Sequence, residues 1–195
     1  MNLPSLHIRR LFSVALAAAM LAACSIWPVE KRVLSGNERI RVAALKTIRA
    51  LPMDERAGVI AAMIGAISSQ DDRITNRAAE ALVACGSAAV DPVIAKLGST
   101  DPYLRTISVA ILGDIGAPVP KIGPALVAAL EDPHPLVREE AAHALSRLGP
   151  SASGAVPALY MTLNDADPDV RDAVQAALKR LGATVPAAGA PAKSS

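Results

Sequence analysis

Few side chains in this 195-residue chain commonly act as nucleophiles or soft metal ligands: Cys24, Cys85, His7, His134 and His143. A metal site needs about three or four ligands at short spacings, and a nucleophile needs a nearby base. None of these residues has such a partner at a matching spacing. No nucleophile elbow, phosphate loop or paired-carboxylate motif occurs either. We therefore expect a protein that is not an enzyme and that needs no cofactor or metal ion.

Cys24 ends a segment that has the polarity of an export signal. Residues 1–10 contain Arg9 and Arg10 and no acid, and the next 13 residues, 11–23 (LFSVALAAAMLAA), are uncharged. A run of this length is too short to span a bilayer but suits the apolar core of a secretory signal. Its end, LAAC at 21–24, resembles the lipobox of bacterial lipoproteins.

The lipobox resemblance implies that residues 1–23 are a lipoprotein signal peptide and that Cys24 is the first mature residue. Its thiol would carry diacylglycerol, and its amino group a further acyl chain such as palmitate. The protein would then be anchored in the cell membrane or outer membrane, facing the periplasm or cell exterior, with residues 24–34 as lipidated Cys and short tether. An ordinary signal with a chance Cys remains open. The Arg9-Arg10 pair only weakly resembles a twin-arginine signal, so we expect Sec export.

The mature chain would have balanced charge. The complete chain has 20 Lys and Arg and 18 Asp and Glu, and residues 1–23 contain two of the Arg, so both totals become 18. Nucleic-acid binding needs a basic surface that releases counterions. The composition therefore argues against a nucleic-acid partner, although residues 30–56 hold seven basic and four acidic side chains.

The rest of the chain repeats one helical pattern. Residues 132–149 (DPHPLVREEAAHALSRLG) return 33 residues later as 165–182 (DADPDVRDAVQAALKRLG), with nine of 18 positions identical. Such a period with helical spacing of apolar residues indicates a solenoid of stacked helix pairs. We expect about nine helices in five units over residues 35–182, the last a half unit. A disordered Pro/Ala/Ser-rich tail would follow at 183–195. Recurring residues mark the units: Arg41, Arg77, Arg105, Arg138 and Arg171; Gly86, Gly116, Gly149 and Gly182; Pro92, Pro124 and Pro157.

The pattern resembles the HEAT-repeat family, in particular its short bacterial repeats related to the phycobilisome-lyase type. The resemblance rests on the two stretches above and on residues 101–116 (DPYLRTISVAILGDIG), and the first two units depart from it by lacking the Pro at helix entry. It implies an all-α fold, an α-α superhelix. It also implies a ladder of contacts between neighbouring units, formed here by Asp132, Arg138, Asp165 and Arg171.

The same resemblance implies that the second helix of each unit lines the concave side. Alignment of the Pro residues then places Val127, Tyr160 and Met161 in neighbouring rows on that side. We expect these residues to contact a partner, unless the rows pack sideways against adjacent helices. Cys85 takes the place of Ile115, Leu148 and Leu181 in the other units, so we expect it to be buried.

Three functions fit these observations. The one we expect is a lipid-anchored, non-catalytic scaffold of the bacterial cell envelope, which binds an envelope protein through its concave groove. The alternative is an accessory lyase-like protein that holds a tetrapyrrole or another small ligand in the groove; pigment on the purified protein would favour it. A purely structural spacer is the third.

Overall fold

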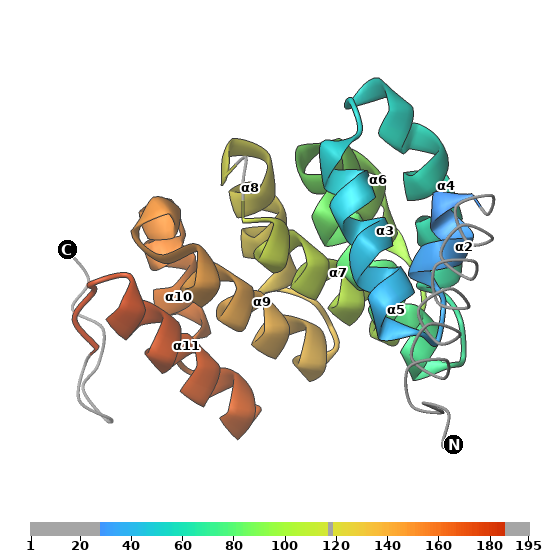
Figure 1. Cartoon of the computed structure of the whole chain (residues 1–195). Helices are drawn as coiled ribbons and strands as arrows, with labels where there is room; N and C mark the ends of the chain where they lie inside the picture. Colours follow the sequence, from blue (N-terminus) through green and yellow to red (C-terminus); the bar gives the residue numbers. More distant parts are fainter. Residues whose placement is uncertain (1–27, 117–118, 186–195) are drawn as a thin grey trace, which may run out of the picture.

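The computed structural model describes residues 28–116 and 119–185, and within them every regular element is a helix (Figure 1). This arrangement is an α-α superhelix of stacked helix pairs, which confirms the expected fold class. The α-helices are α2 (Val29–Val33), α3 (Glu38–Ala50), α4 (Ala57–Ala66), α5 (Asp72–Cys85), α6 (Val90–Ile94), α7 (Pro102–Ile115), α8 (Val119–Ala129), α9 (Pro135–Leu148), α10 (Val156–Thr162) and α11 (Pro168–Arg180). Short 3₁₀ helices are η1 (Asp54–Arg56), η2 (Gly86–Ala89), η3 (Ala95–Gly98) and η4 (Gly149–Ala155).

Local chemistry sets where the longer helices begin and end. The carboxylates of Asp101 and Asp167 accept the N–H groups of Tyr103 and Asp169 and so cap α7 and α11. Each of these helices has Pro at its first position, where a missing N–H costs nothing. At the other end of α7, Gly116 adopts a left-handed conformation with φ of 71°, which suits glycine best.

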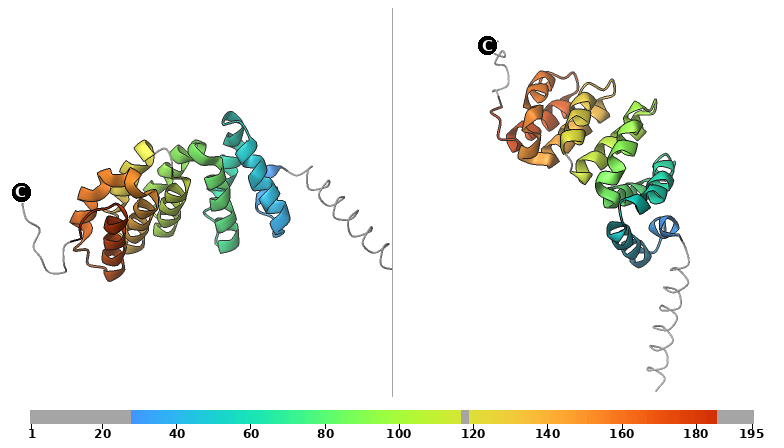
Figure 2. Two further views of the ribbon diagram at one scale, coloured as in Figure 1. Left: turned by 60° about the vertical axis from the view of Figure 1, so that its left-hand side comes forward. Right: turned by 90° about the horizontal axis from the view of Figure 1, so that it is seen from above.

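The helices form two layers (Figure 1). We call α3, α5, α7, α9 and α11 the first helices, and α4, α6, α8 and α10 the second helices. Neighbouring first helices pack directly on one another, whereas consecutive second helices share few contacts. A two-layered stack curves toward the layer with the closer spacing. The first helices accordingly lie on the inner side of the arch, and the second helices run along its outer side (Figure 2, left).

This curvature corrects an expectation. The family resemblance placed the second helices on the concave side, but here they form the convex layer. The reason is packing, because the first helices carry the small and branched apolar residues that stack closely along the solenoid, such as Ala141, Ala144 and Val174.

A short helix precedes the expected start of the solenoid. Residues 24–34 were expected to be a tether, but in the described part α2 packs on α3, and Val33 is fully buried. The guanidinium of Arg77 donates to the Leu34 carbonyl at 3.0 Å, which fixes the end of α2 to α5. Residues 1–23, which we expect to be a signal peptide, and Cys24 lie outside the described residues.

The expected C-terminal tail also begins later than position 183. The carbonyl of Thr184 accepts a hydrogen bond from the Tyr160 hydroxyl at 2.6 Å, and Val185 packs against the core. Residues 186–195 lie outside the described residues.

Residues 72–98 are long and apolar enough to cross a membrane by length and composition alone. The segment is not one straight helix, however, because Gly86 breaks it with a positive φ of 62° between α5 and η2. Leu82, Cys85 and Val93 within it are fully buried against the other helices. The segment therefore forms part of the solenoid core. The burial of Cys85 confirms the sequence expectation, and it raises the pKa of the thiol to about 11.

Candidate functional site

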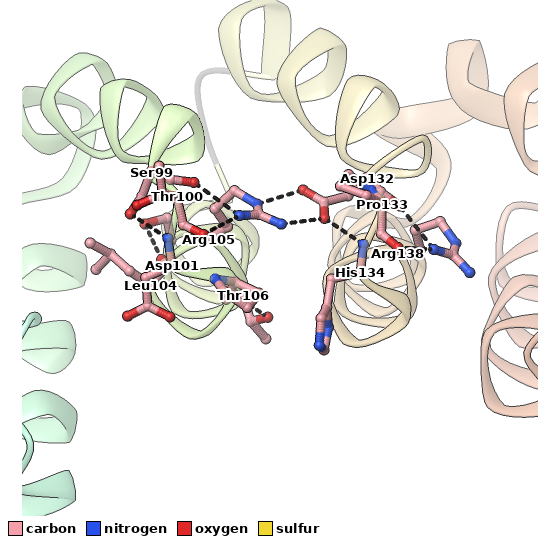
Figure 3. A network of polar contacts seen from close by, with 12 residues as sticks. Ser99, Thr100, Asp101, Leu104, Arg105, Thr106, Asp132, Pro133, His134 and Arg138 are labelled. Carbon is pink, nitrogen blue, oxygen red and sulfur yellow. Dashed lines mark hydrogen bonds and ion pairs between the residues drawn. The ribbon is translucent and has the colours of Figure 1, made fainter.

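A ladder of ion pairs joins the C-terminal units (Figure 3). Arg105 on α7 donates to both carboxylate oxygens of Asp132 at 2.7 Å, the pair drawn in Figure 3. Arg138 on α9 does the same to Asp165. Each Arg also donates to carbonyls of the loop before its own helix, such as Ser99 for Arg105. These contacts confirm the expected roles of Asp132, Arg138 and Asp165.

Arg171, the fourth residue expected in the ladder, ends it. Its guanidinium donates to the carbonyls of Asp165 and Ala166 at 2.7 and 3.0 Å, and among the described residues no carboxylate pairs with it. The sequence interpretation also missed Arg105 as the partner of Asp132. The spacing could have predicted this pair, because Arg105 precedes Asp132 by the same 27 residues that separate Arg138 from Asp165.

The ladder is absent from the N-terminal units. We define the ladder position as the fourth residue after each N-cap, which gives Arg41, Thr75, Arg105, Arg138 and Arg171. In α5 this residue is Thr75, whose hydroxyl donates to the Ser69 carbonyl. Arg77, which the sequence alignment placed here, lies two residues further on and binds α2 instead. Ser69 and Ser99 stand where later units have Asp132 and Asp165, so the loop carboxylate of the ladder is replaced by a hydroxyl there. Arg41 pairs instead with Glu80 within α5.

Side-chain size at one repeated position sets the spacing of the first helices. Eight residues after the ladder position, α7 has Gly113, and a Cβ placed there would lie 2.7 Å from the Cβ of Ala144 on α9. α9 has the small residue Ser146 at the equivalent position. α3 and α5 carry the larger Arg49 and Val83 there. The inner layer is therefore tight from α7 to α11 and open from α3 to α7.

The open half contains a groove of about 710 Å³ on the inner face, which we call the inner groove. Half-buried apolar side chains from α5 and α7 line it, together with Leu45 of α3. Two charged residues of the lining are exposed, Arg49 on α3 and Asp114 on α7. Three charged residues of the lining form ion pairs: Arg41 pairs with Glu80 at 3.4 Å, and Asp114 pairs with Arg147 of α9 at 3.0 Å. Its other apolar lining residues are Val42, Ala79, Val83, Ile107, Ala110 and Ile111.

The residues that the sequence singled out for partner binding lie elsewhere. Val127 lines a separate hollow of about 400 Å³ between α8 and η4, in the outer layer. Tyr160 on α10 is held by Thr184 of the chain itself, and Met161 is 86% exposed. The structure does not bring the three into one groove. Sequence reasoning missed the inner groove because the unit alignment fixed neither the register of α5 nor the direction of curvature.

The lining of the inner groove contains no Cys or His, and its ionisable residues are Arg41, Arg49, Glu80 and Asp114. His134 and His143 both belong to the α9 unit, and no group of three or more potential metal ligands occurs among residues 28–116 and 119–185. The groove offers apolar contacts and charged side chains.

Comparisons with known proteins agree with this architecture. Residues 90–179 match the family model described as HEAT repeats. These residues include α7 to α9 and nearly all of α11, the part in which the ion-pair ladder is present. Among proteins with curated functions, none has a sequence that matches the chain significantly.

Several solved structures share the fold. Human deoxyhypusine hydroxylase in complex with glycerol is 24% identical, with a TM-score of 0.51, over 63% of this chain and 43% of that chain. A designed armadillo repeat protein in complex with peptide (KR)4 is 18% identical, with a TM-score of 0.51, over 84% of both chains. The CpcE–CpcF complex of phycocyanin lyase from Nostoc sp. PCC7120 is 21% identical, with a TM-score of 0.50, over 78% of this chain and 63% of that chain. At these identities the likeness concerns the fold alone.

Proposed function

We propose that this chain is a lipid-anchored, non-catalytic scaffold of the bacterial cell envelope that binds a segment of another protein in the inner groove. The observation that carries the proposal is the groove itself, formed where three successive first helices stand apart on the concave face. Concave faces of solenoids are extended binding surfaces because each unit adds one helix to them. A designed repeat protein of similar fold holds a peptide, which supports a polypeptide ligand.

The groove chemistry favours an apolar segment with charged neighbours. About 710 Å³ of space lies within the roughly 300–1,000 Å³ of ordinary binding pockets, and it can receive several side chains. Burial of the apolar lining would provide affinity, and the carboxylates of Glu80 and Asp114 in the lining would orient the segment through charge. The lining contains no Cys or His, so it offers a tetrapyrrole neither a thioether link nor an imidazole ligand for a bound metal.

Site-specific photo-crosslinking in intact cells tests the groove. A photoreactive amino acid at Asn76, an exposed residue of the groove, should yield an adduct with an envelope protein, whereas the same label at Met161 on the outer layer should not. Ala110→Trp fills the groove and should reduce the Asn76 adduct at least about 10-fold, the loss expected for about 1.4 kcal/mol of binding energy. Ala128→Trp, on the exposed side of α8, is the matched control. An adduct at Met161 but not at Asn76 would contradict the groove and favour the outer rows.

Metabolic labelling tests the anchor. Cys24→Ala removes the only thiol in the lipobox-like sequence, so it should abolish incorporation of radioactive palmitate and leave uncleaved precursor. Cys85→Ala should retain full labelling, because this second thiol is buried in the solenoid core. Normal processing and membrane attachment of the Cys24→Ala chain would show that the anchor assignment is wrong.

A further inference from the structure

Charge is divided unevenly along the solenoid. Residues 28–50, which form α2 and α3, contain six Lys and Arg and two Glu. Residues 51–185 contain 11 Lys and Arg and 16 Asp and Glu. The described part of the chain is therefore an electric dipole along the solenoid axis, with a basic N-terminal end and an acidic remainder. A dipole of this kind orients a protein at a charged surface.

The positive end contains an exposed line of side chains on α3. Arg39, Val42, Lys46 and Arg49 follow one another at intervals of three, four and three residues and are all exposed, so they lie along one side of the helix. We call these four residues the basic stripe. Val42 is 55% exposed and places an apolar side chain among the three cations. Basic and apolar side chains side by side are typical of helices that contact lipid headgroups.

The cations of the stripe have no carboxylate partners within the described residues. Some surface cations elsewhere do, such as Lys121 with Asp91 at 2.8 Å and Arg147 with Glu140 at 2.8 Å, whereas the exposed Lys179 and Arg180 at the end of α11 form no ion pair within the described residues. Arg39, Lys46 and Arg49 form no such ion pair in the part of the chain that the structure describes. Their charge is thus available to an external anion.

We propose that the basic stripe docks on anionic phospholipid headgroups and orients the solenoid axis away from the membrane surface, with α3 at the membrane and α11 distant from it. The orientation rests on the proposed lipid anchor. Cys24 precedes the start of α2 by five residues, which reach at most about 18 Å when extended. Because α2 is packed on α3, the attached lipid holds the stripe close to the bilayer. A partner bound in the inner groove would then lie near the membrane surface, since α3 forms one side of that groove.

The test uses the mature lipidated chain incorporated into two kinds of vesicle, phosphatidylcholine alone or with one third phosphatidylglycerol. Ala43→Cys places a single label beside the stripe, because Cys85 is buried and its raised pKa of about 11 keeps it unreactive at neutral pH. An environment-sensitive dye at position 43 should shift to the blue and be quenched by spin-labelled lipid on the phosphatidylglycerol vesicles, and high salt should reverse both changes. The same dye at Ala176→Cys on α11 should respond equally to both vesicles.

Substitution of the basic residues tests whether the stripe is the surface that binds the headgroups. Each basic residue near an anionic surface contributes a factor of about five, so Arg39→Gln, Lys46→Gln and Arg49→Gln together should lower the docked-to-undocked ratio roughly 100-fold. Lys179→Gln with Arg180→Gln, at the end of α11, is the matched control and should change nothing. An equal dye response in both vesicles, or a response that survives the triple substitution, would overturn the proposal. Loss of the chain from phosphatidylcholine vesicles during flotation would instead refute the lipid anchor, and docking on phosphatidylglycerol could still be observed.

Discussion

Arg138→Ala should destabilise the solenoid by about 3 kcal/mol, measured as the free energy of unfolding in urea. The side chain makes two 2.7 Å bonds to Asp165 and two bonds to the carbonyls of Asp132 and Pro133. Both members of the pair are largely buried, at 15% and 10% exposure. Removal of the guanidinium leaves a carboxylate and two carbonyls without their donor at a junction between units, and water reaches this junction poorly.

Arg171→Ala is the matched control for this prediction. Arg171 occupies the same repeat position and binds the equivalent two carbonyls, but within the described residues it has no carboxylate partner. Its replacement should therefore cost clearly less than that of Arg138. Equal losses for the two variants would mean that the carboxylate contributes nothing.

Acid should remove the difference between the two variants. The bond from Arg138 lowers the pKa of Asp165 below its ordinary value of 3.8, although partial burial opposes this. A carboxylate whose folded-state pKa is depressed contributes stability that is complete above the ordinary value and is lost as pH falls through the folded-state pKa. The excess loss of Arg138→Ala over Arg171→Ala should be full near pH 6 and shrink below about pH 4.

Gly113→Ala should destabilise the solenoid by roughly 1–3 kcal/mol, although alanine normally stabilises a helix relative to glycine. A Cβ at position 113 would lie 2.7 Å from the Cβ and 3.0 Å from the Cα of Ala144 on α9. The nearby Arg147 side chain can move away, but the backbone of α9 cannot do so without separating the two helices. Hydrogen exchange should therefore accelerate along α7 and α9 together.

Two further variants separate the clash from helix propensity. Gly65→Ala on α4 meets nothing within 4 Å, so it should stabilise the protein by roughly 0.5–1 kcal/mol. Ala144→Gly in the Gly113→Ala background removes the Cβ that the new methyl group would meet, so it should recover part of the lost free energy of unfolding. A stabilising Gly113→Ala would show that the α7–α9 contact is not limited by size.

The fold class and the repeat of the C-terminal units could be predicted from the amino-acid order alone. The 33-residue repeat is found by comparing the sequence with itself. The Asp-Pro helix starts and the glycine helix ends depend only on neighbouring residues, so neither feature requires knowledge of distant contacts. The ladder pair of Arg138 and Asp165 could also be anticipated, because stacking of identical units places the same positions side by side. The burial of Cys85 followed in the same way from its place in the apolar pattern.

The direction of curvature, the register of α5 and the position of the groove depend on contacts between distant residues, so they became known from the packed structure. Curvature depends on the difference in spacing between two layers, which results from contacts such as Gly113 against Ala144, 31 positions apart in the chain. The α5 register depends on the cap at Asp71, which places Thr75 at the ladder position and frees Arg77 to bind α2. The inner groove lies where α3 and α5 carry the larger Arg49 and Val83 at the repeat position that holds Gly113 in α7. Such side-chain volumes have meaning only once the helices are packed.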